Sequence, residues 1–189
     1  MGSKILPNGA YTPRFQGSRQ RKPVNTIAAI TKVIPKWDSV VDIGCATGLL
    51  PKGLRELGYR AWGVEGTPGI GETDENIYEV DLSKSIPARR AKKLQADWGV
   101  CLEVGEHIPA KDFHIFLKNL KKLAREFLII TWADHDARGY GHVNCMSQVA
   151  ITCEFVLRGW LVDEEKTQEV RKGMRPKYKQ RLIVFRNSG

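Results

Sequence analysis

The sequence lacks the features that would assign a chain to a membrane, secreted or fibrous class. None of its apolar runs approaches the roughly 20 residues that a transmembrane helix requires. Its first 17 residues contain no apolar signal core, because Pro7, Gly9 and Pro13 interrupt them. The four cysteines form no CxxC pair, which favours reduced thiols and an intracellular, cytoplasmic protein. Because 42% of the residues are hydrophobic, we expect an ordinary globular chain. Because no long apolar run is present, we expect no contact with a membrane.

Acidic residues are missing from the first 35 positions, which carry six basic residues. The formal net charge is +9, and a second basic excess lies in residues 163–189, where eight basic residues accompany four acidic ones. Residues 1–23 are rich in Gly, Pro and Arg without any period, so we interpret them as a basic, flexible arm before one domain at 24–189. The basic termini make RNA a candidate partner, and solubilising tails are the alternative.

Apolar patterns typical of strands and helices alternate along residues 24–189. The predicted strands are 39–44, 59–64, 76–80, 96–102, 126–132 and 181–186, and the predicted helices are 24–34, 47–57, 112–124 and 147–157, with a weaker helix around 89–93. This order predicts a single α/β domain, with a Rossmann-like doubly wound sheet that is mostly parallel, an antiparallel C-terminal strand and helices on both faces. About ten residues separate the second and third strands, so the helix between them should be short or absent.

A turn of small residues, Asp42-Ile43-Gly44-Cys45-Ala46-Thr47-Gly48, follows the first predicted strand. Small residues let a ligand approach the backbone, and the start of the next helix offers free N–H groups. The spacing differs from a GxGxxG fingerprint and from a P-loop. It resembles the first motif of the class I S-adenosylmethionine-dependent methyltransferases, with Ala46 in place of the middle glycine.

Acids at the ends of the next two predicted strands extend the resemblance, which covers about residues 24–186. It implies that Glu65 accepts hydrogen bonds from both ribose hydroxyls of S-adenosyl-L-methionine and that Asp81 contacts the adenine amino group. The alternative is that each acid is an ordinary loop carboxylate. The cofactor-binding residues implied by the resemblance are Asp42, Gly44, Cys45, Ala46, Gly48, Glu65, Gly66, Asp81, Leu82 and Leu102.

The run Glu103-Val104-Gly105-Glu106-His107 follows the fourth predicted strand. In a helical turn, the i, i+3, i+4 spacing would place Glu103, Glu106 and His107 together, a donor set suited to Mg²⁺ or Mn²⁺. The run resembles small-RNA 2′-O-methyltransferases and ubiquinone-pathway O-methyltransferases, and this implies a metal that His142 would help to bind. The alternatives are that His107 acts as a base or orients the acceptor, or that the run is purely structural.

These observations predict a methyltransferase that transfers a methyl group in line to an O or N nucleophile. The catalytic candidates are Glu103, Glu106, His107 and His142. The basic ends favour RNA as the acceptor, at a ribose 2′-hydroxyl or a cap. A small-molecule O- or N-methyltransferase and a non-catalytic partner subunit with this fold are the alternatives.

Overall fold

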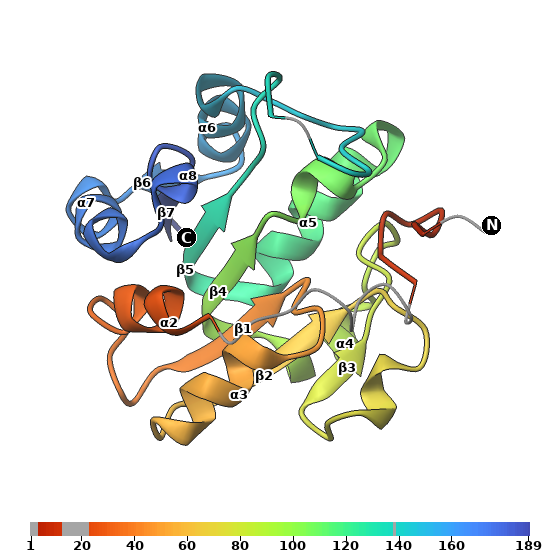
Figure 1. Cartoon of the computed structure of the whole chain (residues 1–189), viewed down its shortest axis with the longest axis horizontal. Helices are drawn as coiled ribbons and strands as arrows, with labels where there is room; N and C mark the ends of the chain where they lie inside the picture. The colour runs from red at the N-terminus through yellow and green to blue at the C-terminus, as the bar shows by residue number, and fades with distance from the viewer. Residues whose placement is uncertain (1–3, 13–22, 138) are drawn as a thin grey trace.

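The computed structural model describes residues 4–12, 23–137 and 139–189. Its centre is a seven-stranded sheet with the strand order β3-β2-β1-β4-β5-β7-β6 (Figure 1). Strands β1 to β5 pair in parallel, whereas β7 runs antiparallel to both β5 and β6. The strands are β1 (Ser39–Ile43), β2 (Arg60–Glu65), β3 (Ile77–Glu79), β4 (Ala96–Leu102), β5 (Ala124–Thr131), β6 (Trp160–Val162) and β7 (Ile183–Asn187).

Helices cover both faces of the sheet, and each face has its own apolar core. One face packs against α2, α3 and α7 through residues such as Ile30, Leu54 and Val170. The other face packs against α4, α5 and α6 through residues such as Leu120 and Phe155. The helices are α2 (Val24–Ile30), α3 (Leu49–Glu56), α4 (Ala88–Leu94), α5 (Phe113–Leu123), α6 (Gln148–Val156), α7 (Glu164–Gly173) and α8 (Pro176–Lys179), with short 3-10 turns η1 (Ile70–Glu72), η2 (Gly105–His107) and η3 (Ala110–Asp112).

Burial on both faces explains why the central strands read as continuous apolar runs rather than as alternating ones. Every residue of β1 is buried, Asp42 included. Side chains of β5 alternate between the two cores, with Ile129 in one and Leu128 and Ile130 in the other. A fully buried side chain of this size contributes about 1.5–3 kcal/mol relative to an exposed one.

The structure confirms the predicted α/β fold class and the antiparallel C-terminal strand. The short connection between β2 and β3 is also confirmed, because it contains only the 3-10 turn η1. Three elements between residues 160 and 179 were not predicted: β6, α7 and α8. Among the described residues, no helix is long and apolar enough to cross a membrane.

Residues 4–12, which we call the N-terminal hairpin, fold back on themselves at the carboxyl edge of the sheet. Ile5 and Tyr11 form an antiparallel bridge, and the backbone N–H of Thr12 donates to Lys4 O at 3.0 Å. The Asn8 side chain donates to Gly66 O, in the residue that follows β2. The interpretation of residues 1–23 as an arm did not anticipate these contacts. Its other basic residues, Arg14, Arg19, Arg21 and Lys22, lie outside the described residues.

Candidate cofactor site

Two neighbouring cavities lie at the carboxyl edge of the sheet, where β1 and β4 are adjacent. The strand order reverses between these two strands, which is where ligands of open α/β sheets bind. The first cavity has a volume of about 310 Å³ and the second about 370 Å³. Both are lined by Gly44, Leu102 and Glu103, so these residues mark the junction between the cavities.

The turn after β1 brings its backbone to the floor of the first cavity. Gly44 has φ +78°, and a Cβ atom there would lie 2.4 Å from Val104 Cγ2, so the position requires glycine. Ala46 holds φ +53°, a conformation uncommon for any residue other than glycine. Its N–H donates to Glu65 Oε2 at 2.8 Å. This hydrogen bond fastens the turn to the end of β2.

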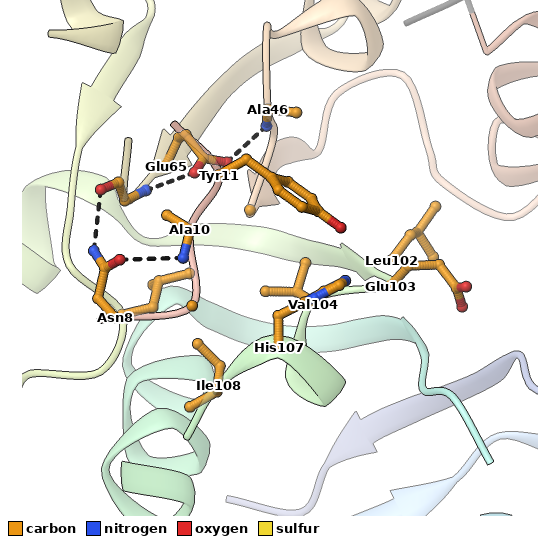
Figure 2. A pocket seen from close by; sticks show the side chains of 14 residues that line it. Asn8, Ala10, Tyr11, Ala46, Glu65, Leu102, Glu103, Val104, His107 and Ile108 are labelled. Atoms are coloured by element: carbon orange, nitrogen blue, oxygen red, sulfur yellow. Dashed lines mark hydrogen bonds between the residues drawn. The ribbon is translucent and has the colours of Figure 1, made fainter. Parts of the chain in front are cut away.

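Glu65 ends β2 and is 5% exposed beside the first cavity (Figure 2). Its Oε1 accepts from the backbone N–H groups of Gly66 and Thr67, at 2.9 and 3.2 Å, while Oε2 accepts from the N–H of Ala46. Burial raises the pKa of Glu65, and these hydrogen bonds oppose the rise. Because each carboxylate oxygen has two lone pairs, Oε2 retains the capacity to accept a hydroxyl of a ligand.

Asp42 lines the second cavity and is 6% exposed. Burial, together with the negative charge of Glu65, raises the pKa of Asp42 to about 8. A buried acid of this kind is stabilised in its charged form by a cation placed beside it. The second cavity can therefore receive the positively charged part of a ligand.

Some of the other residues expected to bind the cofactor line one of the two cavities, and others line neither. Leu82 and Gly66 line the first cavity, and Cys45 lines the second. Gly48, by contrast, lies at the start of α3 outside both linings.

Asp81 also lies outside both linings, and its expected contact with the adenine amino group stays a prediction. Its Oδ1 accepts from the backbone and hydroxyl of Ser83, and Lys84 pairs with it at 3.0 Å. Burial alone would raise the pKa of Asp81, but the bonds from Ser83 and Lys84 outweigh it and hold this pKa below the usual value. Asp81 follows β3 by two residues, and this local turn occupies its carboxylate.

Glu103 lies at the junction of the cavities, directly after β4. It adopts φ +57°, and its N–H donates to the buried Thr131 hydroxyl at 2.9 Å. One carboxylate oxygen, Oε1, is buried without a hydrogen-bond partner among the described residues. A strained residue with an unpartnered acid at a cavity junction is a candidate for contact with ligand.

Glu106 and His107 lie in the 3-10 turn η2, beyond Glu103. Glu106 is completely buried, and neither carboxylate oxygen has a hydrogen-bond partner among the described residues. Burial, followed by the charge of Glu103, raises the pKa of Glu106 to about 8. Burial and the nearby His142 lower the pKa of His107 to about 4, so its imidazole is neutral at physiological pH.

The two histidines of the predicted site meet across the turn. Their ring centroids are 5.0 Å apart, and Nδ1 of His107 lies 3.1 Å from Gly141 O. Potential ligand atoms of Glu106, His107 and His142 lie within 4.8 Å of one another. Glu103 does not belong to this group, so the structure brings together three of the four residues of the expected set. The positive φ of Glu103 turns the chain before η2 begins, so the i, i+3 spacing is not realised as a helix.

Sequence reasoning missed much of the cavity lining. The N-terminal hairpin supplies Asn8, Gly9, Ala10 and Tyr11 to the first cavity. Composition alone could not reveal this contribution, because the hairpin has no periodic pattern. The second cavity is lined by residues from both flanking segments, among them Pro23, Asn25, Thr26, Met174, Arg175 and Tyr178.

No protein-family model matches the chain. A stretch of 78 residues is 33% identical to the ubiquinone biosynthesis O-methyltransferase of Burkholderia thailandensis. The match covers 38% of this chain and 34% of that relative, so the chain spans about a third of the length of the curated relative.

Solved structures are similar over most of the chain. The magnesium protoporphyrin IX methyltransferase of Synechocystis PCC 6803, solved with bound SAH, has a TM-score of 0.60 at 16% identity, covering 93% of this chain and 92% of that one. A sugar N-methyltransferase from Streptoalloteichus has a TM-score of 0.66 at 12% identity, with the same coverages. A methyltransferase in complex with the Trm112 activator of Haloferax volcanii has a TM-score of 0.64 at 13% identity, covering 93% of each chain. The chain therefore has the seven-stranded Rossmann-like fold of the class I S-adenosylmethionine-dependent methyltransferases.

Proposed function

We propose that the protein is a methyltransferase that uses S-adenosyl-L-methionine as its methyl donor. The observation that carries this proposal is the pair of adjoining cavities at the β1–β4 edge, with the buried acid Glu65 beside one and Asp42 beside the other. The donor has a neutral nucleoside end and a charged amino-acid end joined by a sulfonium. The two cavities match this division, because the first is mostly apolar around Glu65 and the second contains opposite charges.

The first cavity suits the nucleoside end of the donor. Glu65 Oε2 can accept a ribose hydroxyl, since a carboxylate suits a diol. Leu82, Val104 and Ile108 offer apolar contact for a planar base. The second cavity suits the amino-acid end, with Asp42 for the ammonium group and Arg175 for the carboxylate.

The chemistry at the junction follows from positioning. The donor supplies an activated methyl group, and transfer to an O or N nucleophile then depends on holding the reacting atoms in line. Glu103 lines both cavities at the junction, where a carboxylate favours a positive charge. Neutral His107, whose Nδ1 lies against Gly141 O, can orient an acceptor hydroxyl through its other ring nitrogen.

For the acceptor, RNA is the candidate favoured by the distribution of charge. Arg175 lines the second cavity, and the charge of Arg181 acts on buried Glu106, so the basic C-terminal segment reaches the site. A small molecule is the second candidate, favoured by the similarity to the protoporphyrin and sugar methyltransferases. The relative bound to an activator makes a partner subunit a further role for this fold, but the retained acids Asp42 and Glu65 favour catalysis.

As the alternative to orientation of the acceptor by His107, we propose that Glu106, His107 and His142 hold a divalent cation such as Mg²⁺ or Mn²⁺. The two orphaned carboxylate oxygens of Glu106 support this, because a cation would satisfy them. A hard cation prefers such oxygen donors. Incubation with EDTA should abolish turnover and Mn²⁺ should restore it, with Glu106→Gln losing the restoration. Full turnover in EDTA would exclude a catalytic metal.

The deciding experiment is transfer of a labelled methyl group to capped RNA, uncapped RNA, protein and phenolic acceptors. Asp42→Ala and Glu65→Ala should each weaken binding of the methyl donor. Glu126→Ala, which removes an acid at the start of β5 away from the cavities, is the matched control. Failure of the wild-type protein to bind the donor would refute the proposal. RNA affinity that falls steeply with salt would favour RNA as the acceptor.

A further inference from the structure

We propose that the N-terminal hairpin forms one wall of the donor cavity and contributes to donor binding. We also propose that Tyr11 couples donor binding to the conformation of the loop 139–144, which contains His142. The inference rests on the proposed function. It assigns residues 4–12 to donor binding, whereas the charge of the N-terminus suggested RNA. The contacts of the hairpin on its two sides support the two halves of the proposal.

On the donor side, the hairpin is attached to the segment that follows β2. Asn8 Nδ2 donates to Gly66 O at 3.1 Å, and Asn8 Oδ1 accepts from the N–H of Ala10 (Figure 2). The Thr67 hydroxyl lies 3.0 Å from both Tyr11 O and Glu65 Oε1. A hydroxyl has one proton, so Thr67 can donate to only one of these at a time. Glu65, which would bind the donor, and the hairpin therefore share the hydroxyl of Thr67.

On the acceptor side, the same hairpin touches the loop after β5. The Tyr11 hydroxyl donates to Tyr140 O at 3.1 Å. The Tyr11 ring lies edge-on to His107, with ring centroids 5.3 Å apart. His107 in turn lies against Gly141 O and the ring of His142. Tyr11 therefore contacts the loop both directly and through His107.

The hairpin docks too closely to be replaced by an arbitrary segment. Gly9 has φ +87°, and a Cβ atom there would lie 2.2 Å from the backbone oxygen of His107. Gly141 has φ +80°, and a Cβ atom there would lie 1.9 Å from Ile5 Cδ1. Because backbone cannot move aside as a flexible side chain can, the fit at Gly9 requires glycine. A substitution at Gly9 should therefore displace the hairpin from this contact.

Gly9→Ala tests the wall. We expect it to weaken binding of S-adenosylhomocysteine about tenfold or more in the full chain, measured by calorimetry, because dislodging the hairpin removes one side of the cavity. Gly69→Ala is the matched control: Gly69 also has positive φ, but a Cβ atom there would meet nothing within 4 Å. Asn8→Ala, which removes the bond to Gly66 without a clash, should weaken binding in the same direction and serves if Gly9→Ala fails to fold.

Tyr11→Phe tests the link, because it removes the hydroxyl bond to Tyr140 and leaves the ring beside His107. In the wild type, S-adenosylhomocysteine should slow amide exchange in residues 139–144, and at saturating ligand this protection should be largely lost in Tyr11→Phe. Normal donor affinity in both Gly9→Ala and Asn8→Ala would refute the role of the hairpin in donor binding. Unchanged protection of residues 139–144 in Tyr11→Phe would refute the coupling through Tyr11. If the wild type binds no donor, the proposed function fails, and this inference fails with it.

Discussion

The pH dependence of donor binding should report the charge of Asp42. In the free protein the pKa of Asp42 is about 8, so the carboxyl group is mostly protonated at pH 6. The proposed donor carries a permanent sulfonium charge, together with an ammonium group, and such cations favour the carboxylate form. Below pH 8, binding must therefore include release of a proton from Asp42, and the affinity should rise as the pH rises towards 8.

The magnitude follows from the same pKa. If binding requires the carboxylate, its fraction rises from about 1% at pH 6 to about half at pH 8, so the limit between these pH values is about 50-fold in affinity, or about 2.3 kcal/mol. Above pH 8 the gain should level off, because Asp42 is then ionised before the ligand arrives. The Asp42→Asn variant keeps the size of the side chain and removes its charge, so its affinity should be low at both pH values and nearly independent of pH.

Calorimetric titrations with S-adenosylmethionine at pH 6, 7 and 8 would measure the effect. Burial also raises the pKa of Glu65, so the neutral analogue 5′-methylthioadenosine, which keeps the ribose and lacks both cations, reports any contribution from that acid. We expect a steep slope for the donor with the wild type and a shallow one for the analogue. Equal slopes for the wild type and Asp42→Asn would refute the assignment of Asp42 to the charged end of the donor.

The remaining predictions concern the site and the core. Glu65→Gln should weaken binding of 5′-methylthioadenosine as much as binding of the full donor, because Glu65 contacts only the nucleoside end. Calorimetry measures both affinities, and a loss confined to the full donor would contradict this assignment. Gly105→Ala should lower the free energy of unfolding by about 1–3 kcal/mol in urea titrations, because a Cβ atom there would lie 1.9 Å from the Trp132 ring; unchanged stability would show that this ring moves freely. Phe155→Ala should cost about 3–5 kcal/mol, since Phe155 is buried and stacks on a neighbouring phenylalanine at 4.6 Å; Val149→Ala, on the exposed side of the same helix, should change stability by less than about 0.5 kcal/mol.

The sequence predicted the sheet because burial on both faces leaves an unmistakable apolar signal in strands such as β4 and β5. It did not predict β6, which has only three residues, or α7, a largely polar helix that buries little more than Thr167 and Val170. Such elements depend on their neighbours rather than on their own pattern. The structure nevertheless places Arg175, from the basic segment 163–189, in the lining of the second cavity.

In the site, too, some residues could be located from the local sequence, whereas the positions of others depend on the folded structure. Glu65 could be placed from its position at the end of β2, and its backbone partners fix its direction. Asp81 comes two residues after β3, where a local turn with Ser83 holds its carboxylate, and the position of the strand end alone does not indicate this turn. Glu103 departs from its expected place because a positive φ value cannot be inferred for a glutamate from sequence.

The antiparallel direction of β7 has a practical consequence for attaching this protein to a surface or a fusion partner. Because β7 runs against β5, its last residues lie beside the start of β5, and Asn187 Nδ2 donates to Arg125 O. The chain thus leaves the sheet at the edge opposite the cavities, whereas residues 4–12 lie against them. An affinity tag or a reporter domain joined after Gly189 should leave the cavities accessible, while one joined close before Lys4 would crowd the docked hairpin.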